Sequence, residues 1–257
     1  MHRQIDFSRY SSIRIGPVVD VALIDRIMPL PQGAFIVGGA NNLLVSPDPA
    51  PLVMLSKHFD YIRLEEDRMT IGAATKSGRI FSFVKRHDIG GFEYLGKLPG
   101  TLGGLVKMNA GMKEDEIFNR LISLRTSGGT YTRDQIVHGY RYAQIDEIVY
   151  EATFAAERGF DREKLALFTR MRANQPRDPS PGSAFKNPPG DYAGRLIEAV
   201  GMKGHRIGDA AFSEIHANFL VNLGNASFED AYALLEMARK RVYETFGIML
   251  ENEVQIV

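Results

Sequence analysis

Three side chains that could act on a substrate stand close together in the stretch PSPGSAFKNP, residues 179–188. Ser183 offers a hydroxyl group, Lys186 an ammonium group and Asn187 an amide. The prolines and Gly182 exclude a regular helix or a central strand, which predicts a rigid loop that can aim these groups into a cavity. An ordinary surface turn has the same composition, so other segments must decide between the two interpretations.

Two glycine-rich segments could hold an anion through backbone N–H groups. In IVGGANNLLVS, residues 36–46, a predicted strand runs into Gly38-Gly39, where the missing Cβ lets N–H groups approach a phosphate; a hairpin turn is the alternative. KLPGTLGGLVKMNAG, residues 97–111, has four glycines within twelve residues, which are costly to order. It matches neither the P-loop nor the Rossmann pattern. We predict that the two segments clasp a long cofactor with a pyrophosphate and a flat ring system.

Composition limits the remaining possibilities. The 257 residues suffice for two or three compact units, and 31 Lys and Arg balance 31 Asp and Glu without a basic run, so we expect a small-molecule partner and no nucleic acid. No signal peptide or membrane-spanning stretch is evident, which predicts a cytoplasmic protein without membrane contact. The absence of cysteine excludes disulfides and a thiolate nucleophile, and the scattered histidines predict no metal site.

The hydrophobic periodicity predicts the elements that must position these groups. Closely spaced short strands are expected over residues 34–73, and a hairpin followed by a long strand over 121–155. Helices are expected over 77–87, from Asp161 to near Gln175, and over 227–246, where Ser227 and Asp230 suit the start and Gly247 the end. The last eight residues, LENEVQIV, predict one more strand over 250–257.

Taken together, the chain resembles the UDP-N-acetylenolpyruvoylglucosamine reductase family, in its compact second type. Seven segments occur in the family's order: SSIRIGP, IVGGANNLLVS, LGKLPGTLGGLVKMNAG, HGYRYA, RANQPRDPSPGSAFKNP, AGRLIEAVGMKGHRIGDAAFSEIHANFLVN and FGIMLENEVQIV. The resemblance implies an α+β fold in which two subdomains bind FAD and a third α+β domain binds the substrate. The domains expected from it are residues 1–70 with the C-terminal strand 248–257, residues 71–157, and residues 158–247.

The resemblance implies an NADPH-dependent flavoenzyme that reduces UDP-N-acetylglucosamine-enolpyruvate to UDP-N-acetylmuramate for peptidoglycan synthesis. NADPH would pass a hydride to FAD, and the terminal carbon of the enolpyruvyl ether would then take a hydride from the reduced flavin. Ser183 would protonate the neighbouring carbon, Arg141 would stabilise the carboxylate and the enolate, and Glu253 would polarise or protonate the substrate. Glu251 points to the same face of a strand as Glu253, so only the resemblance favours Glu253.

The resemblance also implies binding residues. Tyr140, Lys186 and Asn187 would contact the substrate, with a phosphate contact or a solvent-facing position as the alternatives for Lys186. The segment GGANN departs from the frequent GGGSN, which replaces a glycine by Ala40 and a serine by Asn41. The expected FAD-binding residues are Gly38, Gly39, Ala40, Asn41, Asn42, Leu43, Pro99, Gly100, Thr101, Gly103, Gly104, Asn109, Ala110 and Gly111.

Two other functions would share some of these features. A different flavin oxidoreductase, such as a sugar or alcohol oxidase, would share the FAD fold, but the pairing of GSAFKNP with HGYRYA argues against it. A nucleotide-sugar binding protein without flavin would not need both glycine-rich segments and all three catalytic side chains. No protein partner is implied by either the composition or the resemblance.

Overall fold

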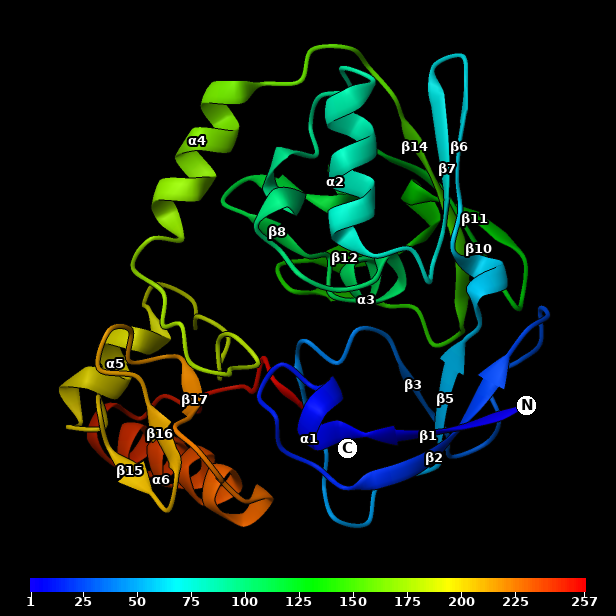
Figure 1. Ribbon diagram of the computed structural model, residues 1–257. Coiled ribbons are helices and arrows are strands. Elements are labelled where there is room, and N and C mark those ends of the chain that lie inside the picture. The colour runs from blue at the N-terminus through cyan, green and yellow to red at the C-terminus, as the bar shows by residue number, and fades with distance from the viewer. The chain divides into compact units, whose positions relative to one another are not determined.

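The computed structural model describes residues 1–257, which divide into two compact units (Figure 1). Unit 1 comprises residues 1–3, 21–39 and 51–173, and unit 2 comprises residues 4–20, 40–50 and 174–257. Two of the boundaries fall inside strands, in β1 (His2–Asp6) and β2 (Val18–Ile24). The three-domain division expected from the resemblance stays a prediction.

An antiparallel five-stranded sheet with the order β11-β10-β14-β7-β6 is the centre of unit 1. It confirms the predicted hairpin, because β10 (Leu121–Thr126) returns through residues 127–129 into β11 (Thr130–Thr132). The strand predicted after that hairpin is β14 (Val149–Ala155), which pairs with β7 (Arg68–Gly72), and β6 (Ile62–Glu65) completes the sheet.

The core of unit 1 is formed by this sheet and two helices. The predicted helix 77–87 is α2 (Ser77–Arg86), and its residues Ile80 and Val84 are fully buried one turn apart, as the helical spacing requires. They share a core with α3 (Leu102–Lys107) and with the sheet residues Ile71 and Phe154. Unit 1 also contains β3 (Phe35–Val37), β5 (Leu52–Leu55), β8 (Gly111–Met112), β9 (Asp115–Glu116), β12 (His138–Gly139), β13 (Tyr142–Ala143), α4 (Arg162–Met171) and the 3₁₀ turns Lys57–Phe59, Glu93–Gly96, Ile117–Asn119 and Arg133–Gln135.

Unit 2 is built around the long helix α6 (Phe228–Phe246). The helix buries Ala231, Leu234, Leu235, Ala238 and Val242 on one face, and these side chains join a core that includes Phe185 and Phe212. The other elements of unit 2 are α1 (Phe7–Tyr10), β4 (Leu43–Leu44), α5 (Ala193–Ala199), β15 (Arg206–Ile207), β16 (Ala210–Phe212), β17 (Leu220–Asn222) and β18 (Gln255–Ile256).

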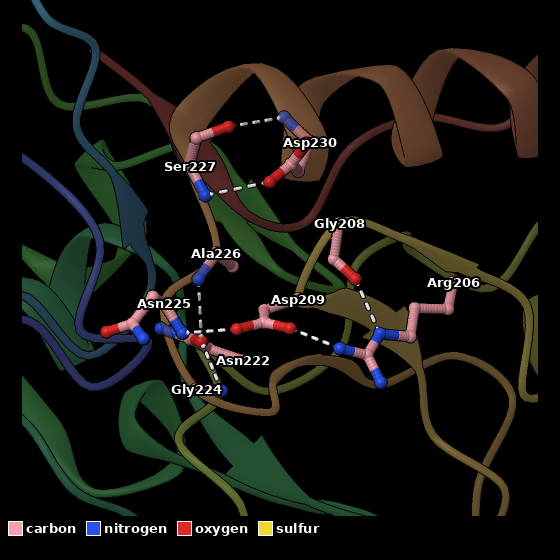
Figure 2. Close-up of polar contacts among 9 residues, drawn as sticks. All are labelled: Arg206, Gly208, Asp209, Asn222, Gly224, Asn225, Ala226, Ser227 and Asp230. Atoms are coloured by element: carbon pink, nitrogen blue, oxygen red, sulfur yellow. Dashed lines mark hydrogen bonds and ion pairs between the residues drawn. The ribbon is translucent and has the colours of Figure 1, made fainter.

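Polar side chains fix the loop that leads from β17 into α6 (Figure 2). Asn222 accepts hydrogen bonds from the N–H groups of Gly224 and Ala226, at 2.9 and 3.1 Å, and Asp209 accepts one from Asn225 at 2.8 Å. Ser227 and Asp230 form the predicted reciprocal cap at the start of α6, with both hydrogen bonds at 3.0 Å. Gly247 ends the helix at a φ of 69°, as predicted.

Some sequence predictions need correction. The C-terminal strand is shorter than residues 250–257, because β18 pairs with β4 only over Gln255–Ile256. Helix α4 ends at Met171 rather than near Gln175. The guanidinium of Arg239, within α6, donates to the carbonyl of Leu250 and the side chain of Asn252. None of the helices combines the length and the apolar character needed to cross a membrane.

Candidate active site

The loop that carries Ser183 is held at several backbone positions within unit 2. Asn222 donates its N–H to the carbonyl of Pro179 at 2.9 Å, and Ala184 donates to the carbonyl of Asn218 at 2.7 Å. Gly182 has a φ of 92°, which few residues other than glycine adopt. The Ser183 hydroxyl itself makes no hydrogen bond within the protein. The predicted rigid loop is therefore present, and it leaves its hydroxyl available.

Asn218 is the residue that fixes the loop most directly. Its side-chain oxygen accepts from the N–H of Phe185 at 3.0 Å, and its side-chain nitrogen donates to the carbonyl of Phe185 at 2.7 Å. Asn218 is 4 % exposed and Phe185 is fully buried, so no water can replace either bond. Sequence reasoning missed this residue, and its only signal was a polar side chain inside the apolar run HANFLVN.

The backbone of Glu253 lies against the same loop. Its N–H donates to the carbonyl of Ala184 at 2.9 Å, directly after Ser183. Its own carbonyl accepts a hydrogen bond of 2.8 Å from the side chain of Asn42. Unit 2 thus brings together the backbones of the predicted catalytic residues Ser183 and Glu253 with the second asparagine of the GGANN segment.

Glu251, the competitor of Glu253, has a different environment. Its side chain is 73 % exposed and forms an ion pair with Lys186, whose own side chain is 20 % exposed. Asn187 is exposed, and its side-chain oxygen accepts from the N–H of Ala193, the first residue of α5. In this structure Lys186 therefore faces a carboxylate and Asn187 caps a helix. Their contacts with a substrate remain predictions.

Gly38 of the first glycine-rich segment meets the second segment within unit 1. A Cβ on Gly38 would lie 2.5 Å from the hydroxyl oxygen of Thr101, so only glycine permits this approach. Two backbone hydrogen bonds hold the second segment in place. The N–H of Gly103 donates to the carbonyl of Ala73, and the N–H of Ser77 donates to the carbonyl of Gly100, both at 2.9 Å. The sequence prediction that these segments act together agrees with this contact.

The end of the first segment has the features of an anion site. The backbone N–H groups of Gly39, Ala40 and Asn41 have no hydrogen-bond acceptor in the protein, although Ala40 is only 3 % exposed. Successive unpaired N–H groups next to a left-handed residue form a concavity that suits a phosphate. Ala40 has a φ of 50°, where the family's frequent glycine would avoid a cost of about 1 kcal/mol. These residues fit the phosphate-bearing cofactor that the sequence predicts.

Arg141 is held in unit 1 at the tip of the hairpin formed by β12 and β13. One nitrogen of its guanidinium donates to the carbonyl of Gly111 at 2.9 Å, and another lies 3.8 Å from the carboxylate of Glu116. The guanidinium also lies over the ring of Tyr140, with 4.9 Å between its carbon and the ring centroid. The sequence pointed to Arg141 and Tyr140 but gave no signal for Glu116.

One cavity lies away from these residues. It measures about 600 Å³, lies in unit 2 beside the start of α6, and is lined by residues such as Arg14, Gly224 and Ser227. None of the predicted site residues lines it. Because Ser183, Glu253 and Asn42 are joined through loop backbones, we assign the candidate site to those loops rather than to this cavity.

Comparison with known proteins agrees with the resemblance. A family profile described as "UDP-N-acetylenolpyruvoylglucosamine reductase, C-terminal domain" matches residues 175–257. The UDP-N-acetylenolpyruvoylglucosamine reductase of Helicobacter hepaticus is 51 % identical, over 98 % of this chain and 98 % of its own length. The enzyme of the same name from Campylobacter jejuni is 48 % identical, over 98 % and 99 %. The crystal structure of the Thermus caldophilus reductase is 29 % identical, with a TM-score of 0.86 over 100 % of this chain and 98 % of that one.

The α+β fold and the matches over the full chain define an oxidoreductase. The predicted fold class is confirmed. The chain belongs to the UDP-N-acetylenolpyruvoylglucosamine reductase family, which acts in peptidoglycan synthesis. Reductases of this family depend on FAD and take reducing equivalents from NADPH.

Proposed function

We propose that this protein reduces the enolpyruvyl ether of UDP-N-acetylglucosamine-enolpyruvate to UDP-N-acetylmuramate in the cytoplasm, with NADPH as reductant and FAD as cofactor. Family membership supports the overall reaction. The observation that carries the assignment to particular residues is the Ser183 loop, which is fixed by Asn218 and by the backbone of Glu253 while its hydroxyl stays without a partner.

The residues of both glycine-rich segments would hold FAD. The free N–H groups of residues 39–41 would bind its pyrophosphate, and the close contact between Gly38 and Thr101 would form one wall of its site. When bound, FAD would accept a hydride from NADPH and deliver a hydride to the substrate. The chain's own residues must then bind the substrate, stabilise negative charge and supply a proton.

Ser183 would supply that proton. Adding a hydride to the terminal CH₂ of the enolpyruvyl group makes a methyl group and leaves an electron pair on the neighbouring carbon, in conjugation with the carboxylate. The Ser183 hydroxyl would protonate this carbon, so hydride and proton together convert C=C into CH–CH₃. A serine is a weak acid, and this transfer requires the strongly basic acceptor that the enolate provides.

Arg141 and Glu253 would act on the same charge. The planar guanidinium of Arg141 suits a bidentate contact with the substrate carboxylate, which gains charge as the enolate forms. Glu253 would polarise or protonate the substrate, from a backbone that is tied to Ala184. Tyr140, Lys186 and Asn187 would contribute to binding of the UDP-sugar.

Ser183→Ala tests this assignment, because the two halves of the reaction can be followed separately by the absorbance of the flavin. We expect reduction by NADPH to proceed at the wild-type rate, while reoxidation by the enolpyruvyl substrate slows by about 10²–10⁴-fold, the usual contribution of a positioned acid. Ser180→Ala is the matched control, since the Ser180 hydroxyl lies in the same loop but accepts from the N–H of Gly182. Equal losses in both half-reactions, or wild-type turnover of Ser183→Ala, would refute Ser183 as the proton donor.

A further inference from the structure

We infer that Glu116 is a positioning residue for Arg141, and that Asn109 holds Glu116 in place. This inference rests on the proposed role of Arg141 in binding the substrate carboxylate. Glu116 lies in strand β9 of the short hairpin formed by β8 and β9, and Arg141 lies at the tip of the neighbouring hairpin. The carboxylate of Glu116 forms an ion pair with Arg141.

Arg141 is held on two sides by one hairpin. The carbonyl of Gly111 and the carboxylate of Glu116 both contact its guanidinium, at 2.9 and 3.8 Å. Gly111 and Glu116 are directly paired across that hairpin, so the two contacts come from one rigid unit. A Cβ on Gly111 would lie 2.2 Å from the carbonyl of Asp115, which shows how tightly the hairpin closes.

Asn109 connects the two hairpins. It is fully buried, and its side-chain nitrogen donates both to the carboxylate of Glu116 at 2.7 Å and to the carbonyl of Gly139 at 3.0 Å. Its side-chain oxygen accepts from the N–H of Phe118 at 3.3 Å. One amide thus ties the residue that faces Arg141 to the hairpin that carries Arg141. The predicted contact of Asn109 with FAD is untested, and its side chain is committed to these bonds.

The backbone of this group is strained. Arg141 has a φ of 60° and Asn109 a φ of 41°, in the left-handed region that residues with side chains rarely occupy. Such conformations persist only where surrounding contacts impose them, and they gather at functional sites. The side chain of Arg141 is 17 % exposed and that of Glu116 is 23 % exposed, so the pair is sheltered from solvent but is still reachable by a ligand.

Glu116 would set the direction in which the guanidinium of Arg141 points. One of its oxygens is held by Asn109, which leaves the other to fix the orientation of the guanidinium. Without that negative charge, Arg141 would retain its bond to Gly111 but could rotate away from the direction in which it meets the substrate. Misplacing a group that binds the transition state lowers the rate of the step it serves and leaves other steps unchanged.

Glu116→Gln tests this inference, because it removes the charge and keeps the size of the side chain. We expect wild-type flavin content and NADPH half-reaction, and a reoxidation by the enolpyruvyl substrate that is slower by about 10–100-fold. Glu116→Asp should recover part of the rate. Asp115→Asn is the matched control, since Asp115 is the neighbouring carboxylate of the same strand but pairs with Lys164, and it should keep both half-reactions within about threefold of wild type.

Arg141→Lys separates this inference from the proposed function. If Arg141→Lys slows reoxidation by the substrate while Glu116→Gln does not, the role of Arg141 stands and that of Glu116 is refuted. If neither substitution affects reoxidation, the proposed role of Arg141 fails as well. A Glu116→Gln protein that loses flavin or slows both half-reactions equally would show that Glu116 only maintains the fold. A double variant no slower than Arg141→Lys alone would confirm that Glu116 acts through Arg141.

Discussion

Replacing Asn218 by alanine should destabilise the protein strongly, because the loop that carries Ser183 depends on it. The substitution removes the two hydrogen bonds of 3.0 and 2.7 Å to the backbone of Phe185. Phe185 is fully buried, so its N–H and its carbonyl would both be left without a partner. Each buried unsatisfied group costs about 1–3 kcal/mol, and we expect a loss of about 2–5 kcal/mol in the free energy of unfolding.

That loss is large against the total stability of a protein, which is about 5–15 kcal/mol. It corresponds to a fall in Tm of about 5–15 °C for a chain of this size. Far-ultraviolet circular dichroism during denaturant and thermal unfolding measures both quantities, and it is preferable to intrinsic fluorescence because the chain has no tryptophan. Reoxidation of the flavin by the enolpyruvyl substrate should slow as well, since the Ser183 loop loses its strongest anchor.

Asn225→Ala is the matched control. Asn225 lies in the same unit and is exposed, and only its backbone N–H is used, in a bond to Asp209. Its removal should change the free energy of unfolding by less than about 0.5 kcal/mol. A loss below about 1 kcal/mol for Asn218→Ala, or equal losses for the two variants, would refute the reasoning that Asn218 fixes the loop.

Two further predictions concern stability. Gly247→Ala should lower the free energy of unfolding by about 1 kcal/mol, because φ is 69° at this position. Gly78→Ala inside α2 should instead raise it by about 0.5–1 kcal/mol, because a Cβ there meets no atom within 4 Å. Unfolding curves of the two variants that moved in the same direction would contradict this. Burial lowers the pKa of His216 below 6.5, so as the pH falls the unfolded chain protonates this imidazole before the folded protein does. The stability that the neutral imidazole contributes is therefore present above pH 6.5 and is lost as the pH falls towards the folded pKa. His216→Gln should flatten that loss in denaturation curves measured across this range, and an unchanged slope would count against a depressed His216 pKa.

Local sequence signals predicted the elements best where one segment contains its own determinants. Helix α6 begins and ends where predicted, because Ser227, Asp230 and Gly247 are neighbours of the helix they limit. The hairpin through residues 127–129 follows in the same way from its turn residues. The C-terminal strand was predicted too long, because the length of a strand depends on its partner, and β4 offers only Leu43–Leu44.

The sequence by itself determined the family, the α+β class and the residue types available for chemistry, because motifs and periodicity are properties of neighbouring residues. It could not separate Glu251 from Glu253. It gave only a polar side chain in an apolar run as a signal for Asn218, and no signal for Glu116 as a support. The tertiary structure decided the contacts of these residues, since it alone pairs Glu251 with Lys186, ties the backbone of Glu253 to Ala184, and sets Asn109 between two hairpins. The catalytic role of Glu253 stays a prediction. Such contacts join residues as far apart in the sequence as Ala184 and Glu253, and their energies depend on burial and direction, which exist only once the chain has folded.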